Sequence, residues 1–263
     1  MTIVVTTASR LGITVVGDRA ITRPESDGPQ IFHAKKVWYS PAANVALAFW
    51  GNAYYPGTSL EQWAGQFTAS IERSETASSV AQRLADSMNA TLEPTGRLWS
   101  DLRRGVHVSG YENALPVVLH VHTGDPNIVH HALRVHRDFP DIHGGGPENH
   151  RRNLDAGARV QLRNGAHELF VTVAILAEES RPQLSRFLRA PVPAPTLSGQ
   201  ASFDAAIVRF AAEVIRSSNQ PQIVSTELDV VAFTDTGLDR EACAQPCNAP
   251  ERQQPPSAFV AAQ

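Results

Sequence analysis

Four short, mainly apolar runs within the first fifty-one positions, the first two of them rich in β-branched residues, constrain the fold more than any other feature of this chain. Residues 3–8 and 13–16 form one pair, residues 37–39 and 44–49 form the other, and a short turn sequence interrupts each pair. Segment 23–30 lies between the pairs and holds two prolines and an Asp-Gly dipeptide, which are typical of loops. The start of the chain therefore predicts two successive β-hairpins joined by a loop.

The remainder of the chain alternates helices with groups of strands. Apolar residues recur every three or four positions after Ser59, which together with Gln62 resembles a capping box, and again before Pro94. The glycine run 144–147 interrupts this pattern, and residues 190–195 predict a stiff, proline-rich linker. The predicted helices are 60–71, 80–88, 167–179 and 203–216, and the further predicted strands are 106–111, 115–121, 128–135 and 228–233.

This pattern predicts one α+β domain over residues 1–240. An extra helix and a proline-rich insertion are expected at about 160–200 within it. The Ala/Gln/Pro-rich residues 241–263 have the composition of a disordered tail.

Composition excludes several classes of function. The 263 residues carry a formal net charge of −3, which gives no electrostatic footprint for nucleic acid or for an anionic membrane surface. No run reaches the roughly 18 apolar residues that a membrane span needs, and no leader pattern starts the chain, so we expect a cytoplasmic protein. His120 and His122 share one face of a predicted strand, but this spacing also fits a half-exposed strand. We therefore predict no metal site and no cofactor.

The second residue offers a specific chemistry. If Met1 is removed, Thr2 carries a hydroxyl nucleophile and a free α-amine that can act as its base. Asp18, Lys36 and Gly51 follow at intervals that hairpins could fold back toward it. Each of these three also has a simpler interpretation, as a solvated turn aspartate, an exposed strand-edge lysine and a turn glycine. The functional hypothesis therefore depends on the combination.

The order of several short motifs resembles that of proteasome β-subunits and their bacterial relatives, which are N-terminal nucleophile hydrolases. Residues 2–4 with 15–20 resemble the opening hairpin of this family. Lys35-Lys36-Val37 resembles its next strand start, and residues 48–53 resemble the strand end and turn that follow. The similarity spans residues 2–237, which is almost the whole chain outside the predicted tail.

The resemblance implies a four-layer α-β-β-α sandwich and a threonine hydrolase that cleaves peptide or amide bonds. Thr2 would attack the carbonyl through Oγ, its own amine would take the proton, and water would hydrolyse the resulting acyl-ester. Lys36, held by Asp18, would favour deprotonation of the hydroxyl, and the backbone N–H of Gly51 would stabilise the oxyanion. The resemblance also implies a homo-oligomeric ring, peptide or unfolded-protein substrates and no cofactor, and it leaves any unfoldase partner unknown.

Departures from the family pattern keep other interpretations open. Aligning the Thr-Ile-Val string places the start methionine where the nucleophile belongs, which predicts an inactive scaffold that acts through partner contacts. An amidase that acts on a small molecule is a second alternative. Gly145 stands where the family commonly has a serine, and residues 217–219 are the nearest polar cluster to the aspartate and serine near its last helix. The sequence does not decide whether Lys35 or Lys36 points into the site.

Overall fold

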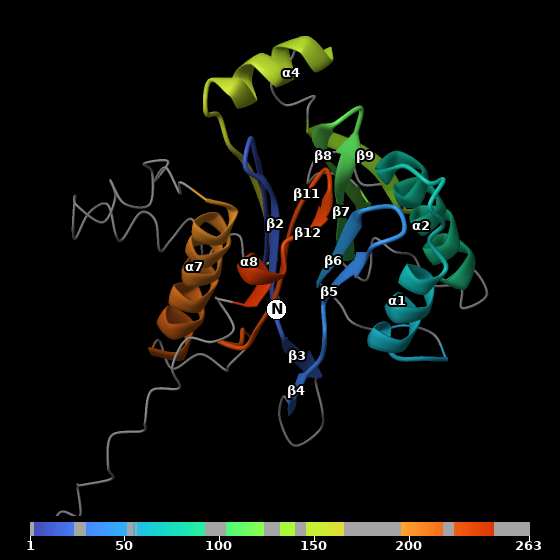
Figure 1. The fold of residues 1–263 in the computed structure, drawn as a ribbon. Coiled ribbons are helices and arrows are strands. Elements are labelled where there is room, and N and C mark those ends of the chain that lie inside the picture. The colour runs from blue at the N-terminus through green and yellow to red at the C-terminus, as the bar shows by residue number, and fades with distance from the viewer. Residues whose placement is uncertain are drawn as a thin grey trace, which may run out of the picture.

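The computed structural model describes residues 3–23, 30–51, 55, 57–92, 104–123, 132–139, 146–165, 196–217 and 224–244. Within these ranges the chain is mostly β-sheet with a few helices, as Figure 1 shows. The strands are β1 (Ile3–Ser9), β2 (Gly12–Asp18), β3 (Ala20–Arg23), β4 (Gln30–His33), β5 (Val37–Ser40), β6 (Val45–Gly51), β7 (Arg104–Glu112), β8 (Leu115–His122), β9 (Arg134–Phe139), β10 (Val160–Gly165), β11 (Leu228–Thr234) and β12 (Gly237–Leu238). The helices are α1 (Leu60–Ala69), α2 (Ala77–Leu92), α4 (Gly146–Asp155), α7 (Leu197–Ser217) and α8 (Arg240–Ala244).

The first sheet has the strand order β10-β1-β2-β11-β12, with antiparallel neighbours. Its centre is the predicted N-terminal hairpin, in which Val4 pairs with Gly17 and Ser9 with Gly12. Gly12 has a φ of 139°, and a Cβ there would lie 2.6 Å from the carbonyl oxygen of Phe233, so the turn requires glycine. Every residue of β1 and β2 is buried. Both faces of the hairpin are therefore covered, which explains its nearly continuous β-branched sequence.

The second sheet has the strand order β5-β6-β7-β8-β9 and is also antiparallel. It begins with the second predicted hairpin, which the structure confirms. The predicted strand 128–135 agrees with the structure only at residues 134–135: residues 132–133 are not strand, and β9 begins at Arg134 and continues to Phe139. This edge strand carries the polar sequence Arg-Val-His-Arg-Asp-Phe, so its apolar alternation is too weak to identify it.

The two sheets face each other, and helices cover their outer faces (Figure 1). Alternate side chains of β1 point in opposite directions, so Val4 contacts the second sheet while Val5 contacts α7. Full burial of an aliphatic or aromatic side chain of this kind is worth about 1.5–3 kcal/mol. The buried cluster between the sheets includes Val4, Ala8, Val15, Ala46, Ala48 and Phe233.

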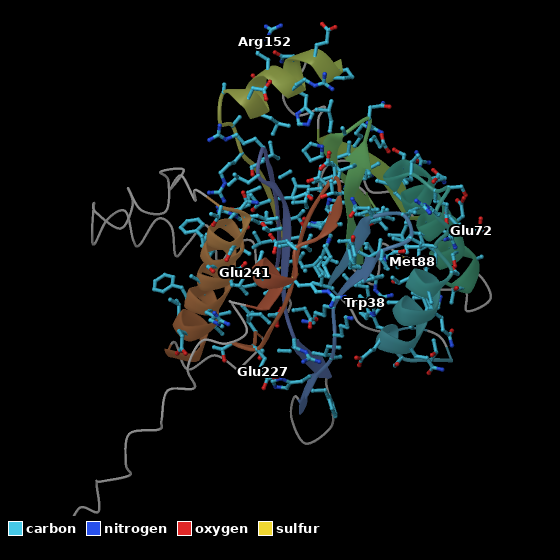
Figure 2. The ribbon with its side chains drawn as sticks, viewed as in Figure 1. Trp38, Glu72, Met88, Arg152, Glu227 and Glu241 are labelled. Atoms are coloured by element: carbon cyan, nitrogen blue, oxygen red, sulfur yellow. The ribbon has the colours of Figure 1, made fainter. Side chains whose placement is uncertain are left out.

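Helices α1 and α2 pack on the outer face of the second sheet. Trp38 and Met88, both labelled in Figure 2, belong to this apolar layer together with Phe49 and Leu84. Ser59 is the N-cap of α1, because its Oγ accepts the backbone N–H of Gln62 at 3.1 Å. This confirms one half of the predicted capping box, while the Oε1 of Gln62 accepts from the hydroxyl of Thr58. The helical periodicity of the sequence is thus the signature of two helices that each bury one face.

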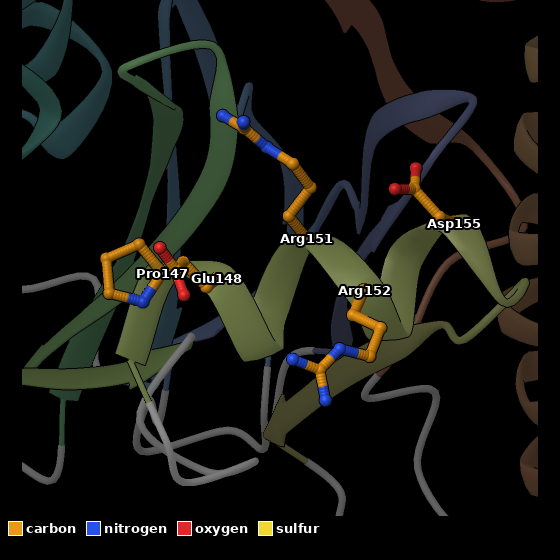
Figure 3. Close-up of a pocket in the computed structure, with 5 residues that line it drawn as sticks. All are labelled: Pro147, Glu148, Arg151, Arg152 and Asp155. Atoms are coloured by element: carbon orange, nitrogen blue, oxygen red, sulfur yellow. The ribbon is translucent and has the colours of Figure 1, made fainter.

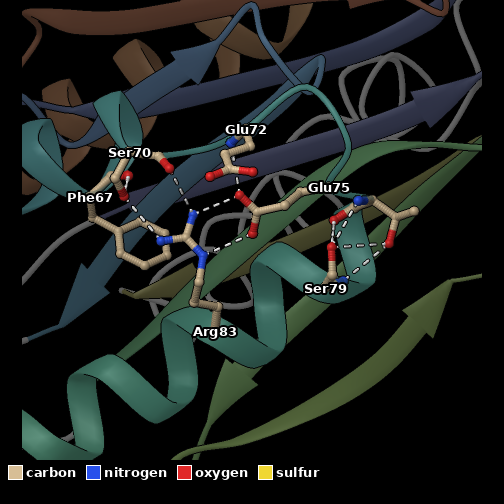
Figure 4. A network of polar contacts seen from close by, with 7 residues as sticks. Phe67, Ser70, Glu72, Glu75, Ser79 and Arg83 are labelled. Carbon is tan, nitrogen blue, oxygen red and sulfur yellow. Dashed lines mark hydrogen bonds and ion pairs between the residues drawn. The ribbon is translucent and has the colours of Figure 1, made fainter.

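A polar cluster fastens the end of α1 to α2 (Figure 4). The guanidinium of Arg83 donates from Nε and Nη2 to the two carboxylate oxygens of Glu75, both at 2.8 Å. Its Nη1 donates to the Oγ of Ser70 at 3.0 Å, and the group lies 4.5 Å above the ring centroid of Phe67. One side chain of α2 therefore holds the C-cap of α1 and the connection between the helices.

Several elements differ from the sequence predictions. β3 and β4 form a short hairpin that was not predicted, with pairs from Ala20–His33 to Arg23–Gln30. The predicted loop 23–30 overlaps these strands only at its first and last residues. Helix α4 and strand β10 were not predicted, and α7 starts at Leu197 rather than 203. The predicted tail begins at 241, but α8 continues to Ala244. The predicted helix 167–179, the linker 190–195 and residues 245–263 lie outside the described residues, so the domain limits stay predictions.

Among the described residues, no helix combines the length and the apolar character that crossing a bilayer requires.

Candidate active site

Asp18 ends β2 and is fully buried. Its Oδ1 accepts the backbone N–H of Ile3 at 2.7 Å and the Nζ of Lys36 at 3.2 Å. Its Oδ2 accepts the backbone N–H groups of Ala20 at 3.0 Å and Ser225 at 3.2 Å. A carboxylate has about four lone-pair positions, and here each oxygen has two donors. The carboxylate is therefore held rigidly between the start of β1, the start of β3 and the segment before β11.

Lys36, and not Lys35, points into the protein. The Lys36 side chain is only 3% exposed, and its Nζ donates to Asp18 and to the carbonyl oxygen of Ala20. Lys35 is exposed, with its Nζ 5.9 Å from the ring centroid of Trp38. The sequence does not decide which of the two lysines points inward. Adjacent side chains of the extended chain that enters β5 point to opposite sides, and it is Lys36 that lies on the buried side.

Burial perturbs both charged groups of this pair. It raises the pKa of Asp18, against the opposing effects of the Lys36 charge and of the N–H groups of Ile3 and Ser225. Burial likewise lowers the pKa of Lys36, against the attraction of Asp18 and, more weakly, of Asp229. Because both shifts disfavour the charged forms, Lys36 gives up its proton more readily than an exposed lysine does.

Asp229 on β11 fixes the backbone at Lys36. Its Oδ2 accepts the N–H of Lys36 at 2.6 Å and the N–H of Val37 at 3.3 Å, while its Oδ1 lies 3.6 Å from the Nε of Arg19. From the sequence, Asp229 is predicted only to lie within the strand 228–233. A carboxylate between Leu228 and the apolar residues that follow it was the signal that could have identified it.

Ser225 is a second residue of the site that no pattern in the sequence indicates. The predicted polar cluster is 217–219, but Ser217 ends α7, and residues 218–219 lie outside the described ranges. The structure instead brings the backbone N–H of Ser225, six to eight positions further along the chain, to Asp18. A backbone donor in a connecting segment leaves no pattern in the sequence, so spacing alone could not locate it.

Gly51 ends β6 on the strand next to Lys36. The N–H of Phe49 donates to the carbonyl oxygen of Lys36 at 3.0 Å, and Gly51 lies two residues further along this strand. Its φ of 85° lies in the left-handed region, which favours glycine. The structure therefore brings Asp18 and Lys36 into contact and places Gly51 at the end of the adjoining strand. Thr2 lies outside the described residues.

The described residues contain no group of three or more histidine, cysteine or carboxylate side chains with a geometry that could hold a metal ion. His120 and His122 do share one face of β8, as their spacing predicts, with ring centroids 4.1 Å apart.

A surface pocket lies on α4 (Figure 3). Strand β10 follows α4, and its first residue Val160 pairs with Ala8 near the end of β1, whereas Asp18 binds the start of β1 at Ile3. We therefore do not include this pocket in the candidate site. Its lining residues are Pro147, Glu148, Arg151, Arg152 and Asp155.

The fold is similar to that of solved Anbu structures. The Anbu (Gly-1) mutant from Hyphomicrobium sp. strain MC1 matches with a TM-score of 0.54 at 15% sequence identity, over 91% of this chain and 86% of that chain. Anbu (ancestral beta-subunit) from Yersinia bercovieri matches with a TM-score of 0.50 at 12% identity, over 90% of this chain and 83% of that chain. No protein-family model and no curated protein sequence matches this chain. At these identities the likeness shows the fold alone, and that fold is α+β and proteasome-like.

Proposed function

We propose that this protein is an N-terminal threonine hydrolase with a four-layer α-β-β-α fold that cleaves peptide or amide bonds. One observation carries the proposal. The Oδ1 of Asp18 binds both the Nζ of Lys36 and the N–H of Ile3, the residue that one peptide bond joins to Thr2. A buried aspartate–lysine pair anchored to the first residues of a β-hairpin is suited to activating a nucleophile at the start of that hairpin.

The proposed reaction uses Thr2 after removal of Met1. The Thr2 Oγ bonds to the carbonyl carbon while the free α-amine takes the hydroxyl proton. The N–H of Gly51 donates to the oxyanion that forms. The intermediate then collapses: the carbon–nitrogen bond breaks, the amine product takes the proton from the α-ammonium group, and the acyl group remains as an ester on Oγ. Water hydrolyses the ester, releases the acid and regenerates Thr2.

Lys36 and Asp18 tune this chemistry. A cationic Nζ near the hydroxyl favours its deprotonation, and the lowered pKa of Lys36, caused by burial, brings the group closer to the range in which it can exchange a proton. Asp18 opposes that shift and fixes the ammonium group in position. The proposal therefore requires both members of the pair, in a geometry set by the two hairpins.

The decisive experiment is the intact mass of the purified full chain before and after incubation with a peptide epoxyketone. This reagent reacts with both the hydroxyl and the free amine of an N-terminal threonine, so we expect loss of Met1 and one adduct per chain. Thr2→Ala should form no adduct, and Thr2→Ser, which keeps the hydroxyl, should still form one. A full-length mass without an adduct contradicts the hydrolase and favours the scaffold. Turnover of small amides but not of peptides supports the amidase instead.

The proposal extends to a homo-oligomeric ring that keeps folded substrates away from the site. The proteasome-like fold supports this part, because rings of that class restrict access to their nucleophiles. Light scattering of the purified full chain should then give a mass that is a multiple of one chain. A monomer at micromolar concentration would contradict the ring, while the adduct assay would still decide the chemistry.

A further inference from the structure

Trp50, the residue before Gly51, is tied to a histidine. Its indole Nε1 donates to the Nε2 of His120 at 2.9 Å, and the two ring centroids lie 5.5 Å apart. The indole lies against Gly105, where an added Cβ would be 2.4 Å from the ring. Because Gly105 is the cross-strand partner of Trp50, only glycine on β7 leaves room for this ring position. Two contacts therefore fix the side chain that adjoins the proposed oxyanion donor.

His120 belongs to a row of four imidazoles on one face of the second sheet. The ring centroids are 5.0 Å apart from His107 to His120, 4.1 Å from His120 to His122, and 4.0 Å from His122 to His136. His107 and His120 are buried, whereas His122 and His136 are half-buried. The row thus runs from the interior, beside Trp50, toward the surface at the edge strand β9.

The hydrogen bonds at the inner end of the row require His120 to be neutral. His107 lies between the Oγ1 of Thr6 at 2.9 Å and the Oδ1 of Asn164 at 2.5 Å. With Oδ1 as an acceptor, Nε2 of His107 carries a proton, while the threonine hydroxyl can donate to or accept from Nδ1. An indole N–H can only donate, so the Nε2 of His120 must be an acceptor, which it cannot be in an imidazolium. The Trp50 contact therefore exists only while His120 is uncharged.

The titratable groups that face His120 are His107 on β7, His122 on β8 and His136 on β9, while Arg134, opposite His122, is exposed at the edge of the same face. Burial, as the largest cause, holds the pKa of His120 well below its usual range, and the charges of His122 and His136 act in the same direction. The unfolded chain would take up a proton near pH 6.5, so stability contributed by neutral His120 is lost as the pH falls.

We propose that the Trp50–His120 hydrogen bond positions the peptide of Gly51, and that protonation of His120 at acid pH breaks this bond and releases the peptide. This inference rests on the proposed function, in which the N–H of Gly51 donates to the oxyanion. His120 is then a positioning residue for that donor. The connection is short, since Gly51 directly follows Trp50 and ends the same strand. Loss of the hydrogen bond would leave the indole held only by its packing and would let the end of β6 shift. A displacement of about 1 Å at such a donor can lower a rate by up to about 100-fold.

Nuclear magnetic resonance of the full chain tests the coupling without any substrate. Trp50 is the only tryptophan followed by glycine, so protein labelled with carbonyl-¹³C tryptophan and ¹⁵N glycine gives one selected amide signal, that of Gly51. Indole-¹⁵N labelling, with Trp50→Phe for assignment, reports the N–H of Trp50. As the pH is lowered from 8 until the protein unfolds, we expect both signals to move with one shared midpoint well below 6.5.

Two substitutions of His120 separate the acceptor from the charge. His120→Gln keeps an acceptor near the Nε2 position and cannot titrate, so both signals should stay at their neutral-pH positions. His120→Phe keeps a flat ring without an acceptor, so both should be displaced at every pH. His33→Gln, at an exposed histidine paired with Glu227, is the control and should leave the wild-type titration unchanged. Different midpoints for the two wild-type signals, or no titration, would overturn the inference whatever the variants do.

The epoxyketone reaction then separates this inference from the proposed function. At pH 7.5 we expect adduct formation to be about 10- to 100-fold slower in His120→Phe and within about 2-fold of wild type in His120→Gln. The rate of adduct formation in wild type should fall at acid pH, and this fall should be smaller in His120→Gln. A wild-type chain that forms no adduct overturns the hydrolase, while the Gly51 and Trp50 signals still decide the coupling. Equal adduct rates in wild type and His120→Phe overturn the positioning role.

Discussion

The Oδ2 of Asp229 accepts the backbone N–H of Lys36 at 2.6 Å, although the two residues are 193 positions apart in the sequence. This contact joins the last long strand of the first sheet to the start of the second sheet. It acts on the backbone of Lys36, while Asp18 holds the Nζ of the same residue. The position of the ammonium group is therefore determined from both ends of the side chain.

Replacing Asp229 with alanine should destabilise the protein and slow adduct formation. The change removes the acceptor for the N–H groups of Lys36 and Val37, and a hydrogen bond to a charged group is worth about 1.5–3 kcal/mol. We expect a loss of this size in the free energy of unfolding, measured by urea titration. Asp235→Ala, at an exposed carboxylate of the β11–β12 turn, is the control and should change the free energy little. Equal effects of both substitutions would show that Asp229 has no specific role.

Replacing Lys36 with methionine should abolish the epoxyketone adduct, whereas Lys35→Met should leave it unchanged. Only Lys36 contacts Asp18, and Lys35 is exposed. Removing one partner of a buried ion pair can destabilise a protein by about 3–5 kcal/mol, because the other charge stays buried. Asp18→Asn combined with Lys36→Met removes both charges and should recover part of that stability without restoring the adduct. An adduct in the folded double variant would exclude the pair from the mechanism.

The sequence predicts the hairpins and helices that build this site, but not the contacts that complete it. Short apolar runs bounded by turn residues identify β1, β2, β5 and β6, because these local patterns follow directly from burial. The contacts of Asp229 and Ser225 depend on how distant segments pack, so no spacing reveals them. The sequence cannot distinguish Lys35 from Lys36 for a related reason. Two adjacent residues of an extended chain point to opposite faces, and both are lysines, so the residue type does not indicate which face is buried.

The missed elements have local causes. β3 and β4 have only four residues each, and prolines follow or precede them closely, so turn signals dominate that segment. α4 begins with Gly146 and Pro147 and is strongly polar, with Leu154 as its buried apolar residue, so the apolar stripe of a packed helix is absent. Proline in the first turn is in fact compatible with a helix start, which is the signal that could have identified α4.

Replacing Arg83 with lysine should destabilise the α1–α2 layer without affecting the site. Lysine cannot reproduce the two parallel bonds to Glu75 or the bond to Ser70. Because the Arg83 side chain is 38% exposed, solvent screens the charge and we expect a loss of only about 0.5–1 kcal/mol. The urea midpoint should fall while the slope of the transition stays constant. Arg73→Lys, at an exposed neighbouring position, should leave the midpoint unchanged, and an unchanged midpoint in Arg83→Lys would contradict the structural role of the cluster.

A fully buried carboxylate, Asp204, joins α7 to the first sheet. Thr14 on β2 donates to its Oδ2, and the Nε2 of Gln161 on β10 donates to its Oδ1 at 2.9 Å. The Nη2 of Arg159 lies 3.5 Å from the same Oδ1. Burial raises the pKa of Asp204, and the hydrogen bonds from Thr14 and Thr7 and the charge of Arg159 oppose that shift without cancelling it.

The raised pKa of Asp204 predicts the sign of a pH effect on stability. In the folded state the carboxyl keeps its proton at a pH where the unfolded chain, with a pKa near 3.8, has lost it. The folded state therefore binds more protons, and the contribution of Asp204 to the free energy of unfolding falls as the pH rises from about 3.8 through the raised pKa. Asp204→Asn cannot titrate, so the stability of wild type relative to this variant should decline over the same range in urea titrations.

The charge of Arg159 makes this prediction specific to the buried network. Because that charge lowers the pKa of Asp204, Arg159→Gln should raise it further and extend the decline to higher pH. The stability of Arg159→Gln is compared with that of the double variant Arg159→Gln with Asp204→Asn. The contributions of the other titrating groups cancel in this difference. A relative stability of wild type that increases with pH would mean that the arginine charge, and not burial, dominates at Asp204. The carboxylate would then stabilise the contact of α7 with the first sheet as an anion.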